Sequence, residues 1–193
     1  MTYFPNWELT IGVWGIMVSL IFLLVVTLLV LSVKGFNIWT EPLSELGALK
    51  KTHKEFNTLL AAYGVCLIPF LYVVGIKFKL YNQPLILTLL LTSSVVSAPA
   101  AKFHSSNKVN VHTVLGGLGF AAACLGSLLF SAYVFTQYPV LGVFQGVLTV
   151  VVVTIMIMGV LKHHSKIPAI YEYAFFGGVV VWNIANSIPF LLN

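Results

Sequence analysis

The chain has 193 residues, of which 59% are hydrophobic and only 8% are charged, and its mean hydropathy is +0.99. Soluble domains carry about a quarter charged residues, so this composition excludes a water-soluble globule, a disordered chain and a nucleic-acid-binding domain. The formal net charge is +5, every cation is a lysine and every acidic side chain is a glutamate. Any carboxylate chemistry must therefore come from glutamate.

Uncharged segments long enough to cross a bilayer recur along the chain. A hydrocarbon core of about 30 Å takes roughly 20 apolar residues of helix, and these segments are apolar on every side, unlike the strands of a membrane barrel. The first segment lacks a basic start and a cleavage site, so we expect a retained helix rather than a signal peptide. Residues 1–193 are predicted to form a single transmembrane domain with helices over about 9–33, 56–76, 84–101, 111–135, 139–161 and 170–192.

The lysines predict how the helices are oriented. Loops 34–55, 102–110 and 162–168 contain eight of the ten lysines, and the other two lie near 77–83. Cytoplasmic loops carry an excess of lysine and arginine, so these three loops should be cytoplasmic and both termini extracytoplasmic. The predicted fold is an all-α integral membrane protein, a bundle of six transmembrane helices that crosses the cell membrane several times. The lipid bilayer is therefore its first partner.

The first of these loops contains a short predicted helix. Thr40 is a favoured N-cap residue, Pro42 is tolerated in a first turn, and Gly47 is typical of a helix end. We expect this helix to lie along the membrane surface or to tuck under the bundle.

Most ionisable side chains gather at the same predicted end of the molecule. The free-energy cost of burying an ionisable side chain keeps these groups out of the hydrocarbon core of the bilayer. This cost does not explain why one end of the molecule holds nearly all of them. This end contains His53, His104, His112, His163 and His164, together with Glu41, Glu45, Glu55 and Glu172. If the protein has a polar site, we expect it at the cytoplasmic end.

Two of these residues begin predicted helices. His112 is followed by Gly116, Gly119, Ala123 and Gly126 at steps of three and four residues. This pattern fits either a helix-packing seam with a histidine at its top or a site residue held by a tight helix pair. Glu172 is favoured by the dipole at a helix start. It either pairs with Lys166 or a nearby histidine, or it binds a head group, a proton or a metal ion opposite His112.

Metal and haem sites stay open at this stage. The candidate metal ligands are His112, Glu172, His104 and His53, whereas adjacent histidines such as His163 and His164 point in different directions on a helix. A catalytic zinc ion would need three such ligands and an open coordination position for water. Haem b would need two histidines at matching depth on facing helices. No cofactor is required by the sequence, and the motifs of soluble enzymes are absent.

Deeper in the last helix, three polar side chains interrupt an apolar segment. Asn183, Asn186 and Ser187 are expected to bond to neighbouring helices, because amides in lipid need partners.

Several short motifs resemble those of a known family. The segment 41–47, Glu-Pro-Leu-Ser-Glu-Leu-Gly, followed by Phe56-Asn57, resembles the first-loop signature of the six-helix membrane family catalogued as domain of unknown function 998. His112 before a glycine-rich helix and Tyr171-Glu172 before a helix with Trp182 are similar to two further motifs of that family.

The resemblance implies a six-helix fold and a ligand-binding cluster, but no reaction. The cluster that it implies consists of Ser44, Glu45, Asn57, His112 and Glu172. The chain departs from the family at Tyr173, where arginine is usual, and in loop 102–110, where an acidic residue is common. A looser similarity, through the Pro-x-Ser-x-x-Gly loop, is to the Frag1/DRAM/Sfk1 membrane proteins.

These observations favour a non-enzymatic membrane protein with a polar pocket at its cytoplasmic end. The pocket would bind a lipid head group or a partner subunit of a membrane complex. Two alternatives remain: a metal-dependent membrane hydrolase of a lipid amide or ester, and a single-haem b-type electron carrier or accessory subunit of a respiratory complex.

Overall fold

The computed structural model of the chain describes residues 7–104, 109–162 and 169–192. Within these ranges the chain is helical, without strands, and the elements follow one another as α1 (Trp7–Ser32), η1 (Leu43–Gly47), α2 (His53–Lys77), η2 (Leu80–Asn82), α3 (Pro84–Val95), α4 (Ser97–His104), α5 (Val109–Phe135), α6 (Pro139–Lys162) and α7 (Ala169–Leu191). Six candidate spans among the described residues are long and apolar enough to cross a membrane, and α3 and α4 together make the third of them. This confirms the predicted all-α bundle of six transmembrane helices.

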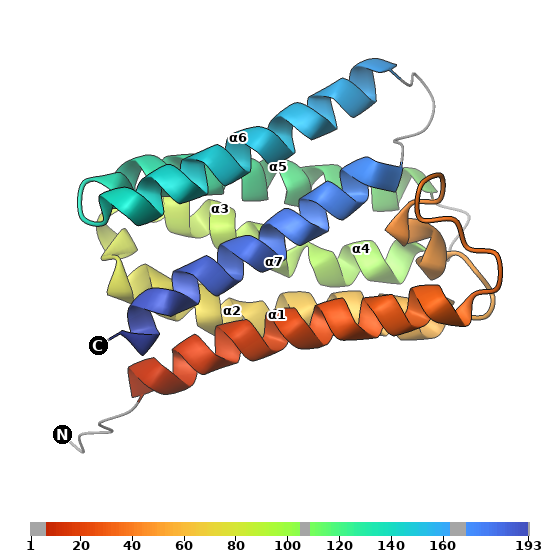
Figure 1. The fold of residues 1–193 in the computed structure, drawn as a ribbon, viewed down its shortest axis with the longest axis horizontal. Coiled ribbons are helices and arrows are strands. Elements are labelled where there is room, and N and C mark those ends of the chain that lie inside the picture. Colours follow the sequence, from red (N-terminus) through yellow and green to blue (C-terminus); the bar gives the residue numbers. More distant parts are fainter. Residues whose placement is uncertain (1–6, 105–108, 163–168, 193) are drawn as a thin grey trace.

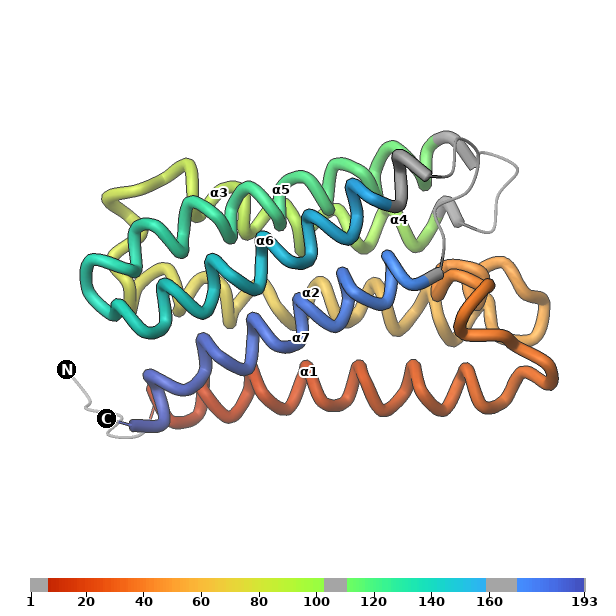
Figure 2. The backbone as a smooth tube through the Cα atoms, turned by 45° about the horizontal axis from the view of Figure 1, so that its top comes forward, coloured from red at the N-terminus to blue at the C-terminus, as the bar shows by residue number. Residues whose placement is uncertain are grey.

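The helices run side by side along the long axis of the molecule (Figure 1). α7 packs between α1 and α6, and α5 packs against α3, α4 and α6, while α2 contacts α1, α3 and α4. The start of α1 and the end of α7 lie at one end of the bundle, and η1 lies at the other (Figures 1 and 2). We call this second end the lysine-rich end, because it carries the exposed side chains of Lys34, Lys50, Lys51, Lys54 and Lys102.

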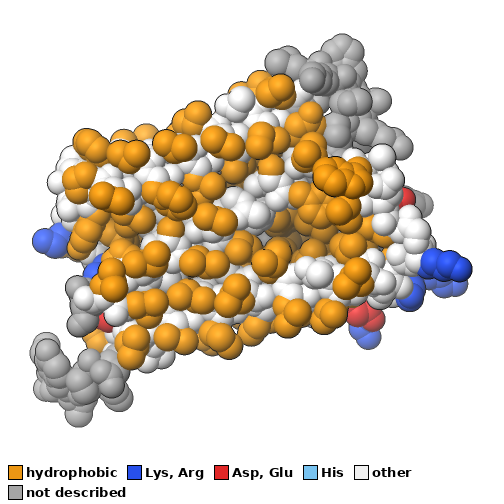
Figure 3. Space-filling model, viewed as in Figure 1, with side chains coloured by type: hydrophobic (Ala, Val, Ile, Leu, Met, Phe, Trp, Pro, Cys, Tyr) orange, Lys and Arg blue, Asp and Glu red, His pale blue; other side chains and the backbone are white. Residues whose placement is uncertain are grey.

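On the face seen in Figure 3, apolar side chains cover the side of the bundle, and the charged side chains of the described residues that are visible lie at its two ends. Large apolar residues such as Leu24 and Val140 are 59% and 86% exposed. A surface of this kind suits lipid rather than water, because a membrane-spanning helix satisfies its own backbone and presents apolar side chains outward. The chain is therefore a multi-pass membrane protein.

The third crossing is divided at Val96 into α3 and α4, which differs from the continuous helix expected over 84–101. Pro99 has no N–H to donate to the carbonyl of Val95. The series of backbone hydrogen bonds in the helix is therefore interrupted one turn before Pro99. The hydroxyl of Ser97 donates to the carbonyl of Ser94 at 2.7 Å beside the break. Gly64 of α2 packs directly on this point, where a Cβ would lie 2.5 Å from the Ser94 carbonyl oxygen and overlap Ser97 Oγ.

The short helix in the first loop is a 3-10 helix that begins at Leu43, and the prediction of Thr40 as its N-cap was wrong. Pro42 occupies the cap position in an extended conformation and makes no side-chain cap, so Thr40 lies outside the helix. Leu43 and Leu46 are buried, at 2% and 0% exposure, and the element packs against α2, α4 and α7. Of the two placements expected for this helix, it therefore tucks under the bundle.

Candidate functional site

A carboxylate at the lysine-rich end is held by the short helix η1. Glu172 lies in the first turn of α7, and Ser44 lies in η1. The Ser44 backbone N–H donates to Glu172 Oε2 at 2.8 Å, and its hydroxyl donates to Oε1 at 2.7 Å. A carboxylate has about four lone-pair sites, so the two bonds from Ser44 leave acceptor capacity on Glu172.

His112 lies in the first turn of α5 and is fixed by α4. Its Nδ1 lies 2.8 Å from the carbonyl oxygen of Ala100. Because a carbonyl only accepts, Nδ1 carries the proton, and Nε2 is an acceptor in the neutral ring and a donor in the charged ring. His112 is close enough to Glu172 for the two to interact electrostatically. The imidazole and the carboxylate therefore belong to one site.

A cavity of about 160 Å³ lies beside these residues and continues into the bundle. Ser44, His112 and Glu172 line its polar end, which we call the mouth. Beyond the mouth most of the wall is apolar, and it comes from α2 to α7. The wall includes Phe56, Leu60, Leu67, Leu71, Leu90, Leu115, Phe120, Leu148, Val152, Phe175, Phe176, Val179 and Trp182.

The cavity is long in the direction of the helices. Along α5 its lining runs from His112 to Ser127, which is about 22 Å at 1.5 Å of rise per residue. The hydrocarbon core of a bilayer is about 30 Å thick. The cavity thus reaches well past the middle of the bundle and has the proportions of one extended chain rather than of a compact solute.

The glycine-rich face of α5 is a packing seam over only part of its length, and the role of His112 as a site residue stays a prediction. A Cβ at Gly126 would lie 3.1 Å from Leu89 Cβ, so this part of the face is a packing seam against α3. A Cβ at Gly116 would meet nothing within 4 Å, and Gly116 lines the cavity one turn from His112. Near the mouth the small residue therefore provides room rather than close helix contact.

The other two members of the implied cluster lie beside the mouth and do not line the cavity. Asn57 donates from Nδ2 to the carbonyl of Gly47 at 3.2 Å, so it fastens η1 to α2. Glu45 is exposed and interacts electrostatically with Glu172. Of the five predicted residues, the structure brings Ser44, His112 and Glu172 together at the cavity.

The remaining candidate ligands do not complete a metal site within the described part of the chain. His53 is exposed, with Nδ1 3.3 Å from the carbonyl oxygen of Lys50. His104 ends α4 but its side chain lies outside the description, as do His163, His164 and Lys166. In residues 7–104, 109–162 and 169–192 no three His, Cys, Asp or Glu side chains could hold one metal ion. The zinc and haem alternatives stay predictions.

The deep polar residues behave only partly as expected from the sequence. Asn183 donates from Nδ2 to the hydroxyl of Tyr63 at 3.0 Å, which is the expected bond between helices. Asn186 and Ser187 instead donate to carbonyls of their own helix, those of Trp182 and Asn183. Sequence reasoning missed Gln145, which is fully buried in α6, although a single amide inside an apolar segment is a recognisable signal.

Comparison with known proteins identifies a family for the chain. The family model described as "Protein of unknown function (DUF998)" matches residues 16–188, which include Ser44, His112 and Glu172. This confirms the main resemblance, whereas the looser similarity to the Frag1/DRAM/Sfk1 proteins stays a prediction. No curated protein and no solved structure matches the chain.

Proposed function

The chain belongs to the DUF998 family, and we propose that it binds one membrane lipid, with the head group at the mouth and the hydrocarbon chain in the cavity. The observation that carries this proposal is the distribution of polarity along the cavity. Ser44, His112 and Glu172 gather at one end, and apolar side chains line most of the remaining length. An amphiphile with a polar head and one long chain is complementary to such a site.

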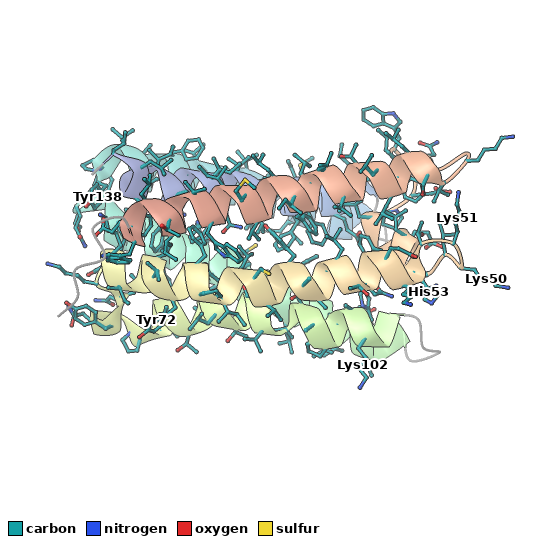
Figure 4. All side chains as sticks on the ribbon, turned by 90° about the horizontal axis from the view of Figure 1, so that it is seen from below. Lys50, Lys51, His53, Tyr72, Lys102 and Tyr138 are labelled. Atoms are coloured by element: carbon teal, nitrogen blue, oxygen red, sulfur yellow. The ribbon has the colours of Figure 1, made fainter. Side chains whose placement is uncertain are left out.

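The chemistry of the mouth favours a head group that donates hydrogen bonds. Glu172 can only accept when it is ionised, and Ser44 uses two of its acceptor sites. Lys50, Lys51 and Lys102 project from the same end (Figure 4) and would attract a phosphate. A phosphoethanolamine head supplies both a phosphate and N–H donors, whereas the nitrogen of phosphocholine has no hydrogen.

The hydrogen bonds at the mouth favour binding over acyl transfer. In a hydrolytic triad the serine hydroxyl donates to the histidine, and the histidine donates to the carboxylate. Here the Ser44 hydroxyl donates to Glu172, and Nδ1 of His112 donates to the carbonyl of Ala100. Ser44 is thus committed to positioning the carboxylate, and we assign it no nucleophilic role.

The orientation predicted from the lysines places the mouth at the cytoplasmic leaflet. A lipid would then enter from the inner leaflet, with its head level with the lysines and its chain directed outward. A partner subunit remains a second interpretation of the same polar end, but the length of the apolar cavity favours a lipid.

The test compares two glycine variants that differ only in where a new side chain points. Gly116 lines the cavity and Gly117 is exposed outside it, and a Cβ at either would meet nothing within 4 Å. Native mass spectrometry of the purified protein would measure retention of lysophosphatidylethanolamine. Gly116→Leu should weaken retention about tenfold, because the new side chain occupies the mouth.

Gly117→Leu is the matched control and should bind as the wild type does. The wild type should also prefer lysophosphatidylethanolamine to the lysophosphatidylcholine of the same chain length. Equal retention by wild type and Gly116→Leu would refute the proposed site.

A further inference from the structure

The connection between α1 and η1 presents two large apolar side chains away from the protein. Ile38 and Trp39 are exposed, Trp39 at 73%, whereas Phe36 of the same connection is partly buried and packs against the core. An indole combines an apolar ring with a polar N–H, so it suits a surface that is apolar on one side and wet on the other. The interface between lipid and water is such a surface, and tryptophan is enriched there.

Hydrogen bonds within the connection build the turn that carries Trp39. Asn37 Oδ1 accepts from the backbone N–H of Trp39 at 2.9 Å. The backbone carbonyl of Asn37 accepts from the N–H groups of Thr40 at 3.1 Å and Glu41 at 2.8 Å. Glu41 Oε2 in turn accepts from the backbone N–H of Asn37 at 3.0 Å. The exposure of Trp39 is therefore a property of a hydrogen-bonded turn.

The length of α1 places this turn at the level of the lipid head groups. α1 has 26 residues, which rise about 39 Å, whereas the hydrocarbon core of a bilayer is about 30 Å thick. Its last turn still presents the exposed apolar side chains of Leu28 and Leu31. Gly35 then adopts a φ of 82°, in the left-handed region, and Phe36 packs back against the core. The turn thus stays beside the end of α1, next to the hydrocarbon.

Two lysines lie at the same end of α1. Lys34 is exposed, and Lys51 Nζ donates to the backbone carbonyl of Ser32, which brings a second cation to the end of the helix. Among the described residues the lysine-rich end carries five exposed lysines and two exposed glutamates, Glu45 and Glu55. An exposed tryptophan beside an excess of positive charge is complementary to a leaflet that contains anionic lipids.

We propose that the turn between α1 and η1 is a binding surface for anionic lipids. Ile38 and Trp39 insert at the interface, and Lys34 and Lys51 attract the phosphate groups. The position of the turn at the end of an apolar helix favours lipid over a protein partner. None of these residues lines the cavity, so the inference goes beyond the proposed function and does not depend on what the cavity binds.

The test measures how brominated lipids quench the fluorescence of Trp39 in nanodiscs of equal parts phosphatidylserine and phosphatidylcholine. The bromine, which quenches only nearby indoles, is placed on the acyl chains of one lipid or of the other. The difference between the wild type and Trp39→Phe gives the emission of Trp39. Quenching should be about twofold stronger with bromine on phosphatidylserine, because lysines near the surface attract anionic lipids. Both leaflets contain both lipids, so the result does not depend on orientation.

Two controls use the opposite end of the bundle. Trp7, whose emission is the difference between the wild type and Trp7→Phe, is also exposed and should be quenched equally by the two lipids. Lys34→Gln combined with Lys51→Gln should remove the preference at Trp39, because glutamine can still donate to Ser32 but carries no charge. Lys79→Gln, at an exposed position of the opposite end, should keep the preference.

Each contrary result refutes the proposed surface. Equal quenching of Trp39 by the two lipids, the same preference at Trp7, or a preference that survives the loss of Lys34 and Lys51 would show that the turn does not select anionic lipids. Quenching of Trp39 by neither lipid would place the indole in water or against another protein. Retention of lysophosphatidylethanolamine by Gly116→Leu is a separate measurement, so the proposed function and this surface can fail independently.

Discussion

At the residue scale, the contact between Ser44 and Glu172 joins two segments that are 128 positions apart in the chain. The carboxylate is partly buried at the start of α7, and both of its oxygens accept from the same residue. A hydrogen bond to a charged group contributes about 1.5–3 kcal/mol, because a buried charge without a partner is costly. The pair thus holds η1 against the mouth of the cavity.

Ser44→Ala removes the hydroxyl donor and leaves the backbone donor in place. We expect a loss of about 1.5–3 kcal/mol in the free energy of unfolding, together with weaker retention of lysophosphatidylethanolamine. Thermal unfolding in detergent would measure the first effect. Ser32→Ala is the control, since that exposed hydroxyl only bonds to a carbonyl of its own helix. A Ser44→Ala variant as stable as this control would show that the contact does not hold η1.

The sequence could predict which site residues share an end of the molecule, but not how they bond. The lengths of the apolar segments place Ser44, His112 and Glu172 at the same depth. The pairing of Ser44 with Glu172 depends on how a loop folds under the bundle, and no local periodicity encodes such a contact. For the same reason the long cavity was not foreseen, because it depends on space between helices and not on any one of them.

At the scale of elements, the division between α3 and α4 is packed against α2 through a glycine. The backbone carbonyl of Ser94 and the hydroxyl of Ser97 lie where a side chain at Gly64 would begin. The two serines and Gly64 also line the cavity, so the break shapes its wall. In the sequence, Pro99 indicates the division between α3 and α4. The apolar segment around it has the length of one membrane-spanning helix, and this length favoured the prediction of a continuous helix.

Gly64→Ala should destabilise the bundle by about 1–3 kcal/mol, because a backbone oxygen cannot move aside as a flexible side chain can. Gly177→Ala is the matched control in α7, where a Cβ would meet nothing within 4 Å and the helix should gain stability instead. The unfolding temperatures of the two variants in detergent would therefore move in opposite directions. If Gly64→Ala also raised the unfolding temperature, the close packing at the break would be contradicted.

At the scale of the whole molecule, the fold was the most predictable feature, because bilayer thickness fixes the length of an apolar helix. The prediction of how the bundle is oriented across the membrane depends on a different property, which is the placement of the lysines in the loops. The exposed side chains of Lys50 and Lys51 lie at the end that holds the mouth, and Tyr81, in the α2–α3 connection, lies at the opposite end and is 64% exposed. These positions give an experiment that separates the two possible orientations.

Lys50→Cys and Tyr81→Cys can each be introduced after Cys66 and Cys124 are replaced by alanine, and then treated with a membrane-impermeant maleimide. If the lysine-rich loops are cytoplasmic, Tyr81→Cys should react in intact cells and Lys50→Cys only in inverted vesicles. The reverse pattern would move the mouth to the outer leaflet, and the lipid would then enter from the opposite side. The cavity itself would be unaffected, because its polarity follows from the contacts of Ser44, His112 and Glu172 and not from the direction of insertion.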